Sequence, residues 1–108
     1  MRNELAAVTD RINLLLARLE RGDYPDRARL EDTLTDGYAC ALSLDAECER
    51  IERRIAEHAA QLTGERAEEH AQELSALPRL LSDRRVELDS LRDLLALLRA
   101  GVQQARVA

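Results

Sequence analysis

The chain has 108 residues and a net charge of −5, with 45% hydrophobic, 34% charged and only 2% aromatic residues. A chain this short forms one domain at most, so we expect a single helical domain over residues 1–108. All 16 basic residues are Arg, but they are scattered among Asp and Glu, so the sequence disfavours nucleic acid as a partner except at a local patch. With no Phe or Trp, the core must come from Leu, Ile, Val and Ala, which suit narrow helix–helix seams.

The first predicted helix covers about residues 2–21. Its apolar residues follow one another at steps of three and four, the spacing of a coiled-coil helix: Leu5, Val8, Ile12, Leu15 and Leu19. Gly22 then ends the helix as a glycine that terminates the last turn.

The second predicted helix covers about residues 25–62, opening at Pro25 and Asp26, residue types that favour a first turn. Its series keeps the steps of three and four throughout: Leu30, Leu34, Gly37, Ala41, Leu44, Cys48, Ile51, Ile55, His58 and Leu62. Thr63 and Gly64 end it.

The third predicted helix covers about residues 65–104 and has the series Ala67, His70, Leu74, Leu77, Leu81, Arg84, Leu88, Leu91, Leu95, Leu98 and Val102. Pro78 leaves this register intact but removes a backbone hydrogen bond. We expect a kink at Pro78, and the alternative is a break at Ser75 and Ala76.

The three series predict an all-α fold in which a short helix joins a long antiparallel coiled-coil hairpin. In an antiparallel hairpin the residue numbers of two facing positions have a constant sum. When the second and third helices are folded about Gly64, the paired seam residues give nearly the same sum along the whole seam, from His58 with His70 to Leu34 with Leu95. The same test pairs the first helix with residues 30–44, including Ile12 with Gly37. We therefore expect a three-helix bundle at one end and a two-helix arm over about residues 46–82.

The cysteines and the short apolar runs indicate where the chain resides. Cys40 and Cys48 are eight residues apart on one predicted helix, a rise of about 12 Å, whereas a disulfide needs Cα atoms closer than about 7 Å. We therefore expect free thiols and a cytoplasmic location. No apolar run approaches the roughly 20 residues of a membrane span, and we expect no signal peptide.

Three groups of residues are candidate sites. His58 and His70 face each other near the hairpin turn and are weak candidates for a metal site, although a structural zinc site needs four ligands. The turn itself carries an acidic excess at Glu65, Arg66, Glu68 and Glu69, which suits contact with a partner or simply a helix start. Arg84 lies on the seam, where it needs Asp45, Glu47 or Asp83 as a partner or must reach solvent.

Leucines beyond the seam widen the apolar face of the bundle segment. We expect these residues, above all Leu14, Leu16, Leu94 and Leu97, to form an interaction surface and the chain to be a homodimer. No phosphate-binding loop and no nucleophile beside a base is recognisable, so we expect neither an enzyme nor a cofactor. The sequence therefore predicts a self-associating coiled-coil interaction or scaffold protein. The alternative is a regulatory factor that binds a larger complex through its acidic-tipped arm.

Overall fold

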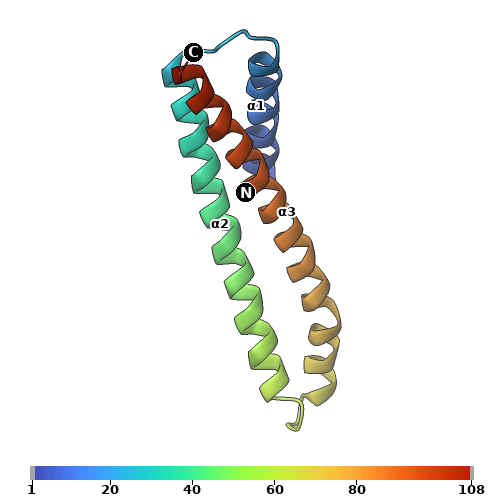
Figure 1. The fold of residues 1–108 in the computed structure, drawn as a ribbon. Coiled ribbons are helices and arrows are strands. Elements are labelled where there is room, and N and C mark those ends of the chain that lie inside the picture. Colours follow the sequence, from blue (N-terminus) through green and yellow to red (C-terminus); the bar gives the residue numbers. More distant parts are fainter. Residues whose placement is uncertain (1, 108) are drawn as a thin grey trace. The chain divides into compact units, whose positions relative to one another are not determined.

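The computed structural model describes residues 2–107, with the side chains of residues 2–104. It contains the helices α1 (Arg2–Glu20), α2 (Arg27–Ala60) and α3 (Ala67–Val107), which Figure 1 labels in chain order. No strand occurs in this part of the chain, so the predicted all-α class is confirmed. Helix α2 is shorter than predicted by two residues at each end, at Arg27 and Ala60, while α3 begins two residues later than predicted, at Ala67, and ends three residues later, at Val107.

The described residues form two compact units. The bundle unit consists of the residues up to Leu42 and those from Asp89 onward, so it holds α1, the start of α2 and the end of α3. The hairpin unit consists of residues 43–88, which include the end of α2, the turn and the start of α3.

Backbone chemistry explains where α1 ends and α2 begins. Gly22 has a φ of 75°, and the N–H groups of Gly22 and Asp23 donate to the carbonyls of Leu19 and Arg18, as in a Schellman motif. The Asp26 carboxylate accepts the N–H of Arg29 at 2.8 Å, which is the hydrogen bond of an N-cap residue. Pro25 therefore precedes α2, one residue before the cap, instead of lying inside the first turn.

The helical core of the bundle unit comes mostly from the predicted apolar series, with Thr33 and Cys40 as additions outside it. The buried helical residues of this unit are Val8, Ile12 and Leu15 on α1, Leu30, Thr33, Gly37, Cys40 and Ala41 on α2, and Leu91, Leu95, Leu98 and Val102 on α3. Gly37 allows close helix packing, since a Cβ atom built on it would lie 2.4 Å from Leu95 Cδ2 and 3.7 Å from Ile12 Cδ1. The predicted pairing of Ile12 with Gly37 is therefore confirmed.

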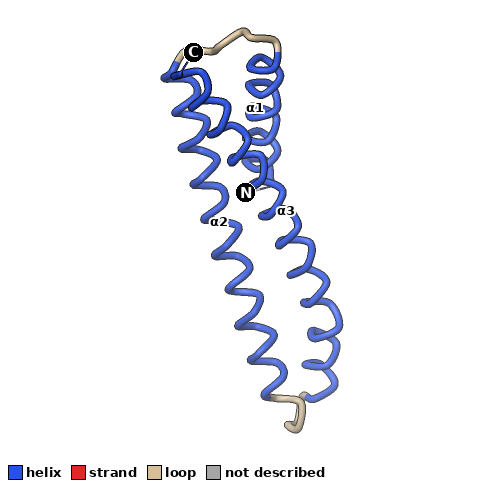
Figure 2. Tube along the Cα trace, in the orientation of Figure 1, coloured by secondary structure: helices blue, strands red, loops and turns tan. Residues whose placement is uncertain are grey.

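In the hairpin unit, α2 and α3 run antiparallel and are joined by the turn drawn in tan in Figure 2. Its apolar cluster combines Cys48 and Ile51 of α2 with Leu77 and Leu81 of α3, as the seam predicts. Helix α3 continues through Pro78 without a break. Leu62, expected in the seam, lies beyond the end of α2 and is exposed, because the chain has already entered the turn.

Candidate functional site

His58 and His70 meet across the hairpin unit, as the seam predicts. Their Nδ1 atoms are 2.7 Å apart, their ring centroids are 5.0 Å apart, and both side chains are half-buried. At this separation one ring donates its N–H and the other accepts, so the pair shares one proton between the two Nδ1 atoms. The contact ties the end of α2 to the start of α3.

Within the described residues, the two histidines have no third potential metal ligand beside them. No group of three or more His, Cys, Asp or Glu side chains is placed there to hold a metal ion. The two imidazoles by themselves supply half of the four ligands of a structural zinc site. The two side chains thus form a hydrogen-bonded pair.

The acidic residues of the turn lie at the surface of the hairpin unit. Glu65 and Arg66 lie in the turn, while Glu68 and Glu69 lie in the first turn of α3, where carboxylates interact favourably with the helix dipole. All four residues are exposed. Beside them is a hollow of about 420 Å³, which is lined in part by Thr63, Gly64, Glu65, Arg66 and His70. The acids are thus available for contact with a partner.

Arg84 pairs with one of the carboxylates that its seam position was predicted to require. Its Nε atom donates to Glu47 Oε1 at 2.9 Å, and its Nη1 atom donates to Glu87 Oε1 at 2.9 Å. The hydrogen bond to Glu47 is the main cause of a raised pKa of Arg84, which therefore stays protonated. Sequence reasoning named Glu47 among three possible partners but did not foresee Glu87, which lies one turn further along the same helix.

The predicted interaction leucines fall into two classes. Leu14 and Leu97 are 68% and 58% exposed, whereas Leu16 and Leu94 are half-buried. Leu42, a further leucine outside the seam, is also exposed. The bundle unit therefore covers part of the leucine surface and leaves part of it open to solvent.

Three of these four leucines lie within two helical turns of the contact between α1 and α3 at Leu19 and Gly101. Leu94, Leu97 and Gly101 share one face of α3, and a Cβ atom on Gly101 would lie 2.8 Å from Leu19 Cδ1 of α1. Leu16 lies one turn before Leu19 on α1. Leu16, Leu94 and Leu97 are named the leucine face. Leu14 does not belong to it, because Leu14 lines a groove between α1 and α2.

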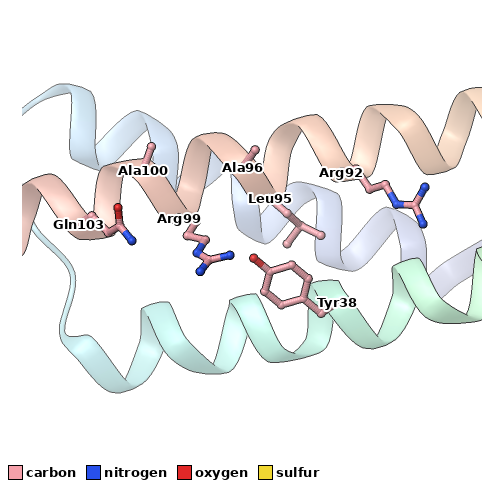
Figure 3. Close-up of a pocket in the computed structure, with 7 residues that line it drawn as sticks. All are labelled: Tyr38, Arg92, Leu95, Ala96, Arg99, Ala100 and Gln103. Carbon is pink, nitrogen blue, oxygen red and sulfur yellow. The ribbon is translucent and has the colours of Figure 1, made fainter.

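A groove between α2 and α3 of the bundle unit was not foreseen. It has a volume of about 320 Å³ and is lined by Tyr38, Arg92, Leu95, Ala96, Arg99, Ala100 and Gln103. Figure 3 shows the Tyr38 ring projecting from α2 toward α3. Tyr38 is half exposed and lies beside Gly37, where the helices approach closely. The ring therefore lines this groove, whereas Leu95 occupies the space beside Gly37.

Comparisons of the chain with protein-family models, with curated proteins and with solved structures gave no match. None of the described helices combines the length and the apolar character needed to cross a bilayer.

Proposed function

We propose that this chain is a non-enzymatic coiled-coil interaction protein that pairs with a second copy of itself through the leucine face. The observation that carries the proposal is Leu97, a large apolar side chain that is 58% exposed beside the half-buried Leu16 and Leu94. Exposed apolar surface next to a packed helical core is typical of a helix–helix interface. Two copies related by a two-fold axis would cover it and form a six-helix body.

The antiparallel seam supports the same proposal, because it makes the helices a stiff scaffold for such an interface. Its apolar residues recur at steps of three and four on both α2 and α3, as in coiled coils. Both cysteines are free, which suits a reducing compartment, so we propose a cytoplasmic location for the dimer.

Light scattering over a range of protein concentrations tests the dimer. We expect the wild-type mass to be twice 12.2 kDa and Leu97→Glu to reduce it to the monomer value, because a buried unpaired carboxylate is costly. Leu42→Glu is the matched control: Leu42 is 70% exposed in the same unit but lies on α2. A wild-type chain that is monomeric at every concentration would refute self-association. Dissociation of both variants alike would place the interface elsewhere.

The second candidate function is a regulatory factor that binds a larger complex through the acidic turn. It is favoured by the exposure of Glu65, Glu68 and Glu69, none of which forms a salt bridge within the described residues. Long-range attraction to a basic partner surface would follow from this charge.

Charge reversal tests this second candidate. The variant Glu65→Lys/Glu68→Lys/Glu69→Lys should fold normally but lose a partner recovered from native lysate. The control variant reverses the exposed acids Glu20, Glu49 and Asp89, and it should keep that partner. Equal recovery with both variants would end the regulatory-arm hypothesis.

A further inference from the structure

A second groove in the bundle unit runs between α1 and the start of α2 and has a volume of about 500 Å³. This basic groove is lined by Arg11, Leu14, Leu15, Ala17, Arg18, Arg21, Arg29 and Thr33. Half of these residues are arginines and none is acidic, in a chain whose net charge is −5. The groove is therefore a local positive site on an acidic protein.

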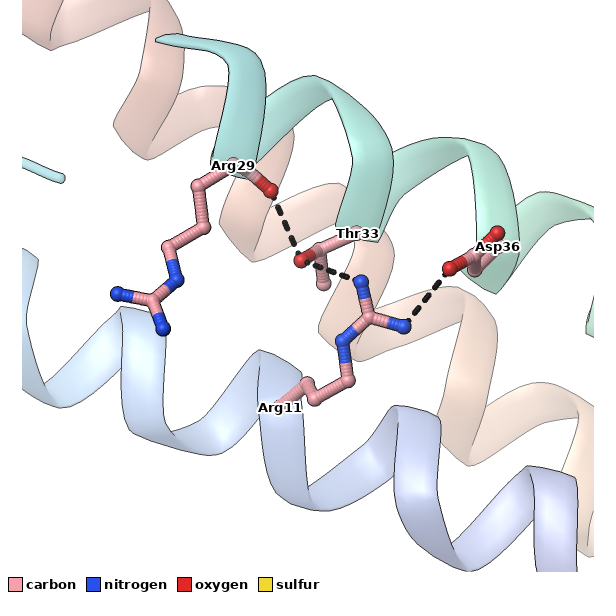
Figure 4. Close-up of polar contacts among 4 residues, drawn as sticks. All are labelled: Arg11, Arg29, Thr33 and Asp36. Atoms are coloured by element: carbon pink, nitrogen blue, oxygen red, sulfur yellow. Dashed lines mark hydrogen bonds and ion pairs between the residues drawn. The ribbon is translucent and has the colours of Figure 1, made fainter. Parts of the chain in front are cut away.

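Two of the arginines are held at the rim by carboxylates. Arg11 Nη1 donates to Asp36 Oδ2 at 2.7 Å, and Arg11 Nη2 donates to Thr33 Oγ1 at 3.2 Å. The Thr33 hydroxyl in turn donates to the Arg29 carbonyl at 2.9 Å, and Figure 4 shows this chain of contacts. Thr33 is only 1% exposed, so its hydroxyl fixes the Arg11 guanidinium from a buried position.

Arg18 is fixed in a similar way at the far end of α1. Its Nε and Nη2 atoms donate to the two carboxylate oxygens of Asp23, at 3.1 and 3.3 Å. This hydrogen bonding lowers the pKa of Asp23, so the carboxylate stays ionised and keeps the arginine in place. Arg11 and Arg18 are thus pre-positioned before any ligand arrives.

The other two arginines of the groove, Arg21 and Arg29, are exposed to solvent. In the described part of the chain, no salt bridge joins Arg21 or Arg29 to a carboxylate, although Asp23 lies near enough to Arg21 to feel its charge. In Figure 4 the Arg29 side chain extends away from Thr33, and no dashed line reaches its guanidinium. These two groups can therefore pair with anionic groups from outside.

The floor of the basic groove is apolar. Leu14 is 68% exposed there, with the buried Leu15 and with Ala17 beside it. From Arg11 to Arg21 the groove follows α1 for about 15 Å, or nearly three helical turns. The apolar lining residues Leu14, Leu15 and Ala17 occupy about one turn in the middle of this length, with arginines on either side, and this pattern matches a short amphipathic helix.

We propose that the basic groove binds an acidic amphipathic helix of a different protein, with its apolar side chains on Leu14 and its carboxylates on Arg21 and Arg29. A second copy of α1 does not fit, because it would bring its own arginines against these arginines. A single acyl chain is a poor ligand for this groove, because Leu14 is largely exposed and the groove therefore cannot enclose the chain. The inference concerns a different face from the leucine face and does not depend on self-association.

The probe is a blocked 14-residue peptide with Leu at steps of three and four and Glu at the flanking positions. Its counterpart carries Lys in place of every Glu. Calorimetry should detect binding of the Glu peptide alone, weaker at higher salt because exposed charges are screened. Arg21→Glu/Arg29→Glu should weaken binding about tenfold or more, since two attractive contacts become repulsive.

Arg50→Glu/Arg53→Glu is the matched control, because these exposed arginines lie on α2 outside the bundle unit. It should bind the Glu peptide as the wild type does, and circular dichroism and light scattering should be the same for both double variants. Equal binding of the two peptides, or equal loss in both double variants, would overturn the proposal. So would binding of dodecyl phosphate at Arg21 and Arg29 without binding of the Glu peptide, since the occupant would then be an anionic amphiphile.

Discussion

Arg84 of α3 and Glu47 of α2 are joined by a 2.9 Å hydrogen bond across the hairpin unit, at a seam position where every neighbouring step is apolar. The Arg84 side chain is only 14% exposed, so its charge has little access to water. Glu87 accepts a second hydrogen bond from the same guanidinium. The seam thus accommodates a cation because two carboxylates neutralise it.

Removing one partner of this pair should destabilise the chain. We expect Glu47→Ala to lower the free energy of unfolding by about 1 kcal/mol, because it leaves a half-buried guanidinium with one partner fewer. Urea unfolding followed by circular dichroism measures this. The control Glu49→Ala, an exposed acid on the same helix, should change stability little. If both variants lose the same amount, the pair has no specific stabilising role.

Replacing the pair by apolar residues should cost less than breaking it. The double variant Glu47→Leu/Arg84→Leu should be at least as stable as Glu47→Ala, because the half-buried cation is then gone from the seam. The same urea titration decides this. A double variant less stable than Glu47→Ala would mean that the charged side chains contribute more to the free energy of unfolding than the leucines that replace them.

Removing one imidazole of the His58–His70 pair should loosen the hairpin turn. His70→Ala takes away the hydrogen-bond partner that lies 2.7 Å from His58 Nδ1 and leaves this half-buried nitrogen unsatisfied. Amide exchange over residues 58–70 and the Tm measure the effect.

The double variant His58→Leu/His70→Leu leaves no unsatisfied imidazole at this seam position, so it should loosen the turn less than His70→Ala does. An equal loss in both variants would show that the hydrogen bond does not hold the turn closed.

Two glycines of the bundle unit should respond differently to alanine. Gly37→Ala should lower stability by about 1 kcal/mol, because overpacking against the buried Leu95 exceeds the gain in helix propensity. Gly101→Ala should be neutral or stabilising, since its only close neighbour is the half-buried Leu19, whose end can move aside. Thermal unfolding compares the two, and a more stable Gly37→Ala variant would show that α2 and α3 can separate there without loss.

The two thiols should react only when the chain opens. Burial raises the pKa of Cys40 and Cys48, so both remain neutral in the folded state. Their contribution to stability is complete below the thiol pKa of the unfolded chain and is lost as the pH rises from there through the raised pKa of the folded chain. Labelling with a disulfide reagent at pH 8 should therefore be slow without urea and fast with it. Rapid labelling of the native chain would contradict the burial.

The sequence predicted the helices and most of the core correctly, because both depend on the spacing of apolar residues within one helix. Steps of three and four place Ile12, Leu44 and Leu91 on the inner sides of their helices, whatever their partners. Gly22 could likewise be recognised as a helix end, because only glycine adopts its positive φ without strain.

The features that the spacing could not predict depend on which helices become neighbours. Thr33 and Cys40 lie off the predicted series, yet they are buried because a third helix covers a wider face of α2 than a single partner would. Glu47 was one of three possible partners for Arg84, and only side-chain geometry selects it.

The basic groove illustrates the same limit. Arg11, Arg18, Arg21 and Arg29 appear scattered among acids along the chain, and they line one groove only because α1 packs beside the start of α2. Local sequence periodicity therefore determined the helices and their buried sides. Tertiary packing decided which charges gather and which leucines stay exposed, because these properties belong to pairs of helices and not to any one of them.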